Sequence, residues 1–252
     1  MGSGRVKLFL LALVGLLAVG GATVSLREPE STLDRGDFET GDLSQWRERQ
    51  CLPERISVSQ GPPEAAQGDL RAKFEVRDGD VEPQTGSERC ELVGPSLPHE
   101  GERWYRQAFY MPSEGDPPDS WQIISQWYSN YGGSPPLALF QDMDLPMRFS
   151  LRHGDSSRLY WRSDELERDR WHEIVVGVYF SESPSRGWVE VWLDGRQQTL
   201  ANGRTRMHGA TRGATRGSFK TGIYRDPDSE VTSLQYLDDV SVGPSRESVT
   251  QD

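Results

Sequence analysis

Hydrophobic residues in this chain fall in short runs that alternate with polar residues from about residue 36 onward. Clusters of Gly, Pro, Asp and Ser separate the runs, for example at residues 61–63, 116–118 and 134–136. The 3.6-residue repeat of amphipathic helices is almost absent. The pattern predicts strands over residues 55–59, 70–77, 88–93, 103–111, 121–128, 137–141, 147–153, 159–163, 172–181, 188–194, 218–225 and 234–242. Strands in this number predict an all-β domain of two packed sheets.

Alternation within three of these strands predicts which side chains share a face, because successive residues of a strand point to opposite sides. In residues 89–92, Cys90 and Leu92 are expected to face the core, with Arg89 and Glu91 on the opposite face. In residues 219–224 the expected core residues are Phe219 and Ile223, and the opposite face has Lys220, Gly222 and Tyr224. In residues 121–128, strict alternation groups Gln122, Ile124, Gln126 and Tyr128 against Trp121, Ile123, Ser125 and Trp127.

The N-terminus has the pattern of an export signal. Arg5 and Lys7 precede an apolar run over residues 8–19 and the small residues 20–22, so we expect a signal peptide at 1–22 that is cleaved near Ala22. An uncleaved membrane anchor is the alternative. We expect a linker at 23–35, the globular domain at 36–243 and a flexible tail at 244–252. In an exported chain Cys51 and Cys90 are candidates for a disulfide, and two buried free thiols are the alternative.

Net charge narrows the range of partners. The chain has 28 Lys and Arg residues against 39 Asp and Glu residues, a formal charge of −11, so we expect no nucleic-acid partner. Residues 195–225 contain no Asp or Glu but have seven basic residues: Arg196, Arg204, Arg206, Arg212, Arg216, Lys220 and Arg225. This segment either concentrates an anionic ligand or forms a solvated loop. We expect a monomer.

Several common catalytic motifs are absent from the sequence. There is no Cys-x-x-Cys pair, no His-Glu-x-x-His, no Walker loop and no Gly-x-Ser-x-Gly. The four histidines are scattered at positions 99, 153, 172 and 208. His172 begins an apolar strand and is expected to be structural, while His153 is a reserve catalytic candidate. Zinc protease, NTPase and serine hydrolase chemistry therefore lack the residues that they need.

The order of several short motifs resembles the jelly-roll polysaccharide lyases, a group that includes glucuronan lyase, type I heparin lyase and, more distantly, alginate lyases. The resemblance spans nearly all of residues 36–243. Its motifs are residues 36–41 (Gly-Asp-Phe-Glu-Thr-Gly), 89–91 (Arg-x-Glu), 126–128 (Gln-Trp-Tyr, similar to the family's Gln-x-His), 219–224 (Phe-Lys-x-Gly-x-Tyr) and 236–240 (Tyr-Leu-Asp-Asp-Val). It implies a jelly-roll β-sandwich of the concanavalin type with a concave groove.

The chemistry that this resemblance implies is β-elimination at a uronic acid without an organic cofactor. A base removes the C5 proton, which is only weakly acidic while the adjacent carboxylate is charged, so Arg89 and Gln126 are expected to neutralise that carboxylate. Tyrosine can act as base and then as acid when nearby cations stabilise its phenolate. The resemblance thus implies Tyr224 in this role, with Lys220 and Arg89 supplying positive charge.

Tyr128 stands where many members of the family have histidine, which removes an obvious base. In a D-gluco or D-manno uronate, the C5 hydrogen and O4 leave from the same side of the ring, so one tyrosine can serve both steps. We therefore expect syn elimination by Tyr224 on a glucuronan-like or glycosaminoglycan-like polysaccharide, with Tyr128 assisting or positioning the sugar. The alternatives are an inactive carbohydrate-binding module and a glycoside hydrolase of similar fold.

Further residues are expected to contact the saccharide or a metal ion. Candidate substrate contacts are Glu91, Arg216, Arg225 and Trp192, the last because it faces away from the aliphatic side of its strand. The alternatives are aromatic packing under a loop for Trp192 and an ion pair with Arg89 for Glu91. Terminal strands of such sandwiches often pair, which would bring acidic residues near both ends of the domain together. Some relatives have a structural Ca²⁺, so Asp37, Glu39, Asp238 and Asp239 are candidate ligands, and solvated turn acids are the alternative.

Overall fold

The computed structural model describes residues 35–129, 133–143, 146–213 and 216–251. The predicted signal peptide at 1–22 and the linker up to residue 34 lie outside the described residues. Among the described residues, no helix has both the length and the apolar character needed to cross a membrane.

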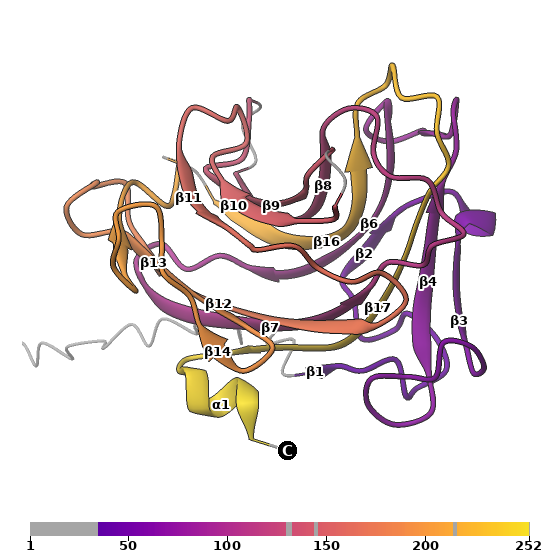
Figure 1. The fold of residues 1–252 in the computed structure, drawn as a ribbon, viewed down its shortest axis with the longest axis horizontal. Coiled ribbons are helices and arrows are strands. Elements are labelled where there is room, and N and C mark those ends of the chain that lie inside the picture. The colour runs from indigo at the N-terminus through magenta and orange to yellow at the C-terminus, as the bar shows by residue number, and fades with distance from the viewer. Residues whose placement is uncertain (1–34, 130–132, 144–145, 214–215, 252) are drawn as a thin grey trace, which may run out of the picture.

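Two antiparallel sheets form the molecule and lie one over the other (Figure 1). The nine-stranded sheet has the order β14-β13-β12-β7-β17-β4-β3, with β1 beside β17 and β15 beside β13. Its strands are β1 (Arg35–Gly36), β3 (Ile56–Ser59), β4 (Arg71–Val76), β7 (Gly101–Tyr110), β12 (Trp171–Phe180), β13 (Trp188–Leu193), β14 (Arg196–Gln197), β15 (Met207–His208) and β17 (Ser233–Gly243). The expected β-sandwich is therefore confirmed.

The eight-stranded sheet has the order β11-β10-β9-β8-β16-β6-β2, with β5 beside β6. Its strands are β2 (Glu48–Gln50), β5 (Val81–Glu82), β6 (Ser87–Ser96), β8 (Gln122–Ser129), β9 (Leu137–Gln141), β10 (Phe149–Arg152), β11 (Leu159–Arg162) and β16 (Gly217–Arg225). This sheet curves, and the ends of its strands rise away from the other sheet (Figure 1).

The main core lies between the two sheets and consists of inward-facing side chains from both. Cys90, Leu92, Phe219 and Ile223 belong to it and are fully buried, which confirms the faces predicted for β6 and β16. Burying aliphatic and aromatic side chains on one face of each strand stabilises the sandwich by removing apolar surface from water. It also leaves the polar side chains of β6 and β16 on the opposite face of the sheet.

The predicted faces of β8 are wrong over its first half. Ile124 and Trp127 both belong to the core, whereas Ile123 packs in a separate cluster with Trp121. The pairing of β8 with β9 shifts register between Ile123 and Ser125, and a β-bulge of this kind inserts one residue and reverses the alternation. Strict period-two alternation could not anticipate this shift.

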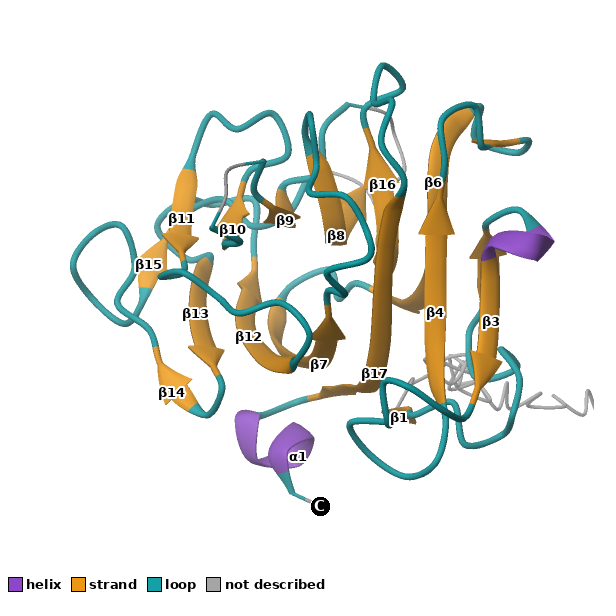
Figure 2. Cartoon of the chain, turned by 45° about the vertical axis from the view of Figure 1, so that its right-hand side comes forward, coloured by secondary structure: helices purple, strands orange, loops and turns teal. Residues whose placement is uncertain are grey.

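Each of the twelve predicted strands corresponds to an observed strand, with ends that differ by about three residues or less. The five strands that were not predicted, β1, β2, β5, β14 and β15, have two or three residues each. The tail expected at 244–252 includes a short helix, α1 (Arg246–Thr250), which Ser245 caps and whose Val249 is buried. Figure 2 shows α1 below β7 and β17. The expected pairing of terminal strands is present, because Gly36 pairs with Val240.

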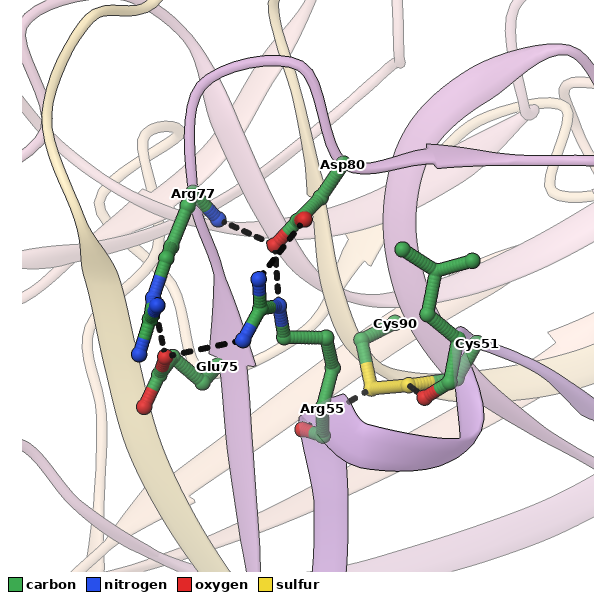
Figure 3. The surroundings of a disulfide bond; sticks show 7 residues. Cys51, Arg55, Glu75, Arg77, Asp80 and Cys90 are labelled. Atoms are coloured by element: carbon green, nitrogen blue, oxygen red, sulfur yellow. Dashed lines mark hydrogen bonds and ion pairs between the residues drawn. A yellow bond between two sulfur atoms is a disulfide. The ribbon is translucent and has the colours of Figure 1, made fainter.

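A disulfide joins Cys51 and Cys90, as predicted for an exported chain. It ties the residue after β2 to the middle of β6. The turn that follows, η1 (Pro53–Arg55), is held by the ion pair of Arg55 with Asp80, whose Nε–Oδ2 distance is 2.5 Å (Figure 3). The segment that follows the edge strand β2 is thus fixed by covalent and ionic contacts, while β2 itself pairs with β6.

Candidate active site

A groove with a volume of about 810 Å³ lies on the face of the eight-stranded sheet that points away from the core. Its lining includes all five residues that the sequence singled out as catalytic candidates: Arg89 from β6, Gln126 and Tyr128 from β8, and Lys220 and Tyr224 from β16. These three strands are adjacent in the order β8-β16-β6. The fold therefore brings together residues that lie up to 135 positions apart in the sequence.

Glu91 orients two of these residues from below the groove. Its side chain is buried, with 1% of its surface exposed. One carboxylate oxygen accepts a hydrogen bond from Nη1 of Arg89 at 3.0 Å, and the other accepts one from Nε2 of Gln126 at 2.6 Å. A buried carboxylate between two donors fixes both side chains in one geometry. Glu91, expected to contact substrate, instead lies behind the two residues that line the groove.

Tyr224 is half-buried, and its ring is held between a cation and an aromatic side chain. The guanidinium carbon of Arg89 lies 3.9 Å from the centre of the Tyr224 ring. Trp121 packs edge-on against the same ring with a centroid distance of 5.0 Å. Gly222 precedes it on the groove face with φ of +133°, and a Cβ at this position would lie 2.2 Å from the carbonyl oxygen of Cys90. Only glycine fits there, so the bend before Tyr224 is built into the sequence.

Lys220 occupies the middle of the groove floor and is 6% exposed. Its Nζ donates a hydrogen bond to Oε1 of Gln50 at 2.8 Å and lies 4.6 Å from the centre of the Tyr128 ring. Burial lowers the pKa of Lys220 below its usual range, and the charge of Glu91 opposes that shift. Lys220 thus places a positive charge between Arg89 and Tyr128.

The structure adds groove residues that the sequence did not indicate. Gln50 belongs to β2, which is too short to show any periodicity. Trp121 and Phe140, which belong to one hydrophobic cluster, line the groove together with the loops at 133–135 and 154–156. Asp155 in the second loop accepts hydrogen bonds from Ser157, which lower its pKa to about 2.

His153, the reserve candidate, is hydrogen-bonded through Nδ1 to Asp155 at 2.6 Å. It therefore lies at the edge of the groove. His172 is buried, and its two ring nitrogens face Asp194 and the carbonyl oxygen of Glu167. This position agrees with the structural role expected for His172.

Three of the expected substrate contacts are not brought to the groove. Trp192 lies on β13 of the other sheet and packs against Trp104 at a centroid distance of 5.2 Å. Arg225 points away from Tyr224 and forms a buried ion pair with Glu88, with an Nη2–Oε2 distance of 2.8 Å. Arg216 is exposed and precedes β16 without contributing to the described groove lining. In each case a partner distant in sequence, or a loop conformation, decides the position.

The basic segment 195–225 does not form a single cationic surface. Besides Arg225, Arg206 pairs with Glu190 at 2.5 Å and Arg212 with Glu182 at 2.6 Å. Acidic residues from other parts of the chain therefore neutralise much of the local excess of charge. Lys220 is the member of the segment that lines the groove.

The four candidate metal ligands already interact with protein donors. Glu39 accepts hydrogen bonds from the backbone amides of Asp69 and Leu70. Asp238 accepts one from the amide of Gln67, and its burial raises its pKa to about 7. Asp37 accepts a hydrogen bond from the side-chain amide of Gln45, and Asp239 forms an ion pair with Arg106. Within the described ranges, no group of three or more His, Cys, Asp or Glu residues is arranged to hold a metal ion. Calcium binding by these four residues stays a prediction.

Comparison with protein-family models gives a match over most of the described chain. The model of the polysaccharide lyase family matches residues 38–241, which include all five catalytic candidates. The chain belongs to this family. The resemblance noted from the short motifs is thereby confirmed, and lyases of this kind need no organic cofactor.

Solved structures support the fold of this polysaccharide lyase. The endo-β-1,4-glucuronan lyase of the fungus Trichoderma reesei is similar with a TM-score of 0.61, at 16% identity over 85% of this chain and 96% of that one. The catalytic domain of a glycoside hydrolase family 131 protein from Coprinopsis cinerea has a TM-score of 0.55, at 13% identity over 80% of this chain and 83% of that one. The structure of an alginate lyase has a TM-score of 0.52, at 13% identity over 84% of this chain and 94% of that one. No curated protein matches the chain at a significant level.

Proposed function

We propose that this polysaccharide lyase cleaves a glucuronate-containing polysaccharide by syn β-elimination, with Tyr224 as base and then as acid. The observation that supports this most directly is the position of Arg89. Its guanidinium lies 3.9 Å from the centre of the Tyr224 ring, and both side chains line the groove. A donor for the substrate carboxylate and a group that can take up a proton are thus adjacent.

Arg89 and Gln126 bind the carboxylate of the sugar whose bond is cleaved. A guanidinium has five N–H donors, of which Ser87 and Glu91 engage Nε and Nη1. The amide nitrogen of Gln126 has two N–H donors, and one of them binds Glu91. The remaining donors can neutralise the carboxylate and the negative charge that spreads onto it when the C5 proton leaves.

The elimination itself then requires one proton carrier. The phenolate oxygen of Tyr224 takes the C5 proton, and the C5–H electron pair forms the C4–C5 double bond. The C4–O4 bond breaks with its electrons, and the O4 leaving group takes the proton back from Tyr224. Arg89 and Lys220 place positive charge beside the reacting groups. Tyr128, whose ring contacts Lys220 at 4.6 Å, positions the sugar.

The groove favours this chemistry over glycoside hydrolysis, although a glycoside hydrolase shares the fold. Hydrolysis with two carboxylates requires them to face each other across the scissile bond. Of the described residues that line the larger groove, Asp155 alone has a carboxylate. Glu91 is buried behind Arg89 and Gln126. The acidic residues are therefore not placed for that mechanism.

Two further parts of the proposal concern location and metal binding. We propose that the enzyme is secreted, which the N-terminal pattern of residues 1–22 and the Cys51–Cys90 disulfide support. The proposed mechanism includes no calcium step, because the four candidate ligands do not line the groove.

Absorbance near 230 nm tests the reaction, because only elimination produces the unsaturated uronate that absorbs there. The enzyme is incubated with glucuronan, heparin-type glycans, hyaluronan and alginate, and reducing ends are counted in parallel. We expect absorbance and reducing ends to rise together on glucuronan. Reducing ends without absorbance would establish hydrolysis instead. Retention on a glycan column with neither signal would establish a binding module, and cleavage only at iduronate or guluronate would contradict syn elimination.

A further inference from the structure

A second hollow of about 270 Å³ adjoins the groove. The two hollows share Gln50, Tyr128 and Lys220. The second one adds Arg47, Glu48, Val93 and Ser218. The shared residues form the boundary between the two hollows. A polysaccharide can therefore extend from one hollow into the other over Lys220.

The direction of this extension follows from the strands. Arg89 and Val93 are four residues apart on β6, which is about 13 Å at a rise of ~3.3 Å per residue. Tyr224 and Ser218 are six residues apart on β16, which is about 20 Å. These separations are longer than one sugar ring. A sugar held at Arg89 and Tyr224 therefore does not reach the second hollow, which lies further along the same strands.

The charges in the second hollow favour an anion at one end. Arg47 is exposed, and its Nη1 donates a hydrogen bond to Ser96 at 2.7 Å, which holds the guanidinium in place. Its other N–H donors are available for a ligand. Glu48 accepts a hydrogen bond from Gln50 at 2.8 Å and lies close enough to Lys220 to affect its pKa. The hollow has a net positive charge, because the positive charges of Arg47 and the buried Lys220 outnumber the one negative charge of Glu48.

We propose that this second hollow, the Arg47 subsite, binds the carboxylate of another uronate residue of the same polysaccharide chain. The inference rests on the proposed function, because it takes the sugar held by Arg89 and Tyr224 as the point of cleavage. A chain that occupies both hollows has acidic sugars beyond the scissile bond. Arg47 then makes the enzyme select long substrates.

The test compares Arg47→Ala with Arg49→Ala. Arg49 lies two residues further along the chain on β2, is exposed and lines neither hollow, so it is a control for the loss of one positive charge. Initial rates at 230 nm are measured on glucuronate oligosaccharides of increasing length. We expect Arg47→Ala to lower kcat/KM on the longer oligosaccharides by about tenfold to a hundredfold, the effect of one hydrogen bond to a charged group. The shortest cleaved oligosaccharide should be cleaved as by wild type, and Arg49→Ala should match wild type at every length.

An equal loss at all lengths, or no loss at any length, would overturn the Arg47 subsite while leaving the proposed reaction intact. If wild type itself forms no product that absorbs at 230 nm, the proposed function fails separately. The subsite is then tested by calorimetric titration of wild type and Arg47→Ala with a glucuronate hexasaccharide. Weaker binding by Arg47→Ala would support the subsite, and equal binding would overturn it.

Discussion

Replacing Glu91 by glutamine tests the idea that one buried carboxylate orients the two groups that bind the substrate. Glu91 is 1% exposed and accepts a hydrogen bond on each oxygen, from Arg89 at 3.0 Å and from Gln126 at 2.6 Å. Glutamine has nearly the same shape but one oxygen and one NH₂ group. With Arg89 and Gln126 oriented as in the structure, the NH₂ of the new amide faces a donor whichever way it turns, so one of the two hydrogen bonds is lost.

The magnitude follows from the bond that is lost. A hydrogen bond to a charged group is worth about 1.5–3 kcal/mol, and about 1.4 kcal/mol corresponds to a factor of ten. Because Arg89 and Gln126 act on charge that develops in the transition state, we expect kcat/KM to fall by about tenfold to a hundredfold, mainly through kcat. Loss of the Glu91 charge also lowers the pKa of Lys220 further, since that charge opposes the effect of burial. The alkaline limb of the pH profile should therefore move to lower pH.

The assay is the initial rate at 230 nm over a range of pH, together with thermal unfolding of each variant. Glu75→Gln is the matched control, because Glu75 is a partly buried carboxylate that pairs with Arg55 and Arg77 outside the groove. It should retain wild-type kinetics. If Glu91→Gln unfolds like wild type and also keeps wild-type kcat/KM and pH profile, the orienting role of Glu91 is refuted.

Three further predictions concern stability. Gly222→Ala should lower the unfolding free energy by about 1–3 kcal/mol or more in chemical denaturation, because its Cβ would lie 2.2 Å from the carbonyl oxygen of Cys90 and φ is +133°; unchanged stability would contradict the geometry. Replacing Cys51 and Cys90 together by serine should cost about 4 kcal/mol, given the 39-residue separation, and an unchanged urea midpoint would contradict this. Burial raises the pKa of Asp238 from 3.8 to about 7, so its stabilising contribution is complete below pH 3.8 and is lost as pH rises through about 7. Urea denaturation between pH 5 and pH 8 should show this decline in wild type and a flatter profile in Asp238→Asn, whereas equal profiles would refute it.

The sequence predicted the parts of the site that lie on long, regularly alternating strands. On β6 and β16, the alternation of Cys90 and Ile223 with polar residues was sufficient to place Arg89, Lys220 and Tyr224 on one face. Turn residues between the strands marked where the twelve longer strands begin and end. Both signals depend only on neighbouring residues, so a single sequence is enough to detect them.

What could not be predicted depends on contacts between distant segments. The bulge in β8 moves Ile123 to the groove side, and no residue in that strand marks it. Gln50 reaches Lys220 from a three-residue strand that has no pattern of its own. Arg225 turns inward because Glu88, 137 positions away, is buried beside it. Such pairings are decided by the packed fold rather than by local sequence.

The central claim is tested most directly by comparing Tyr224→Phe with Tyr128→Phe at 230 nm on glucuronan. Phenylalanine keeps the ring that Arg89 and Trp121 pack against, so only the hydroxyl group is removed. We expect Tyr224→Phe to lower kcat by about 10²–10⁴-fold, the usual contribution of a general base or acid, and Tyr128→Phe to affect mainly KM. A folded Tyr224→Phe enzyme that forms the unsaturated product at the wild-type rate would contradict the mechanism.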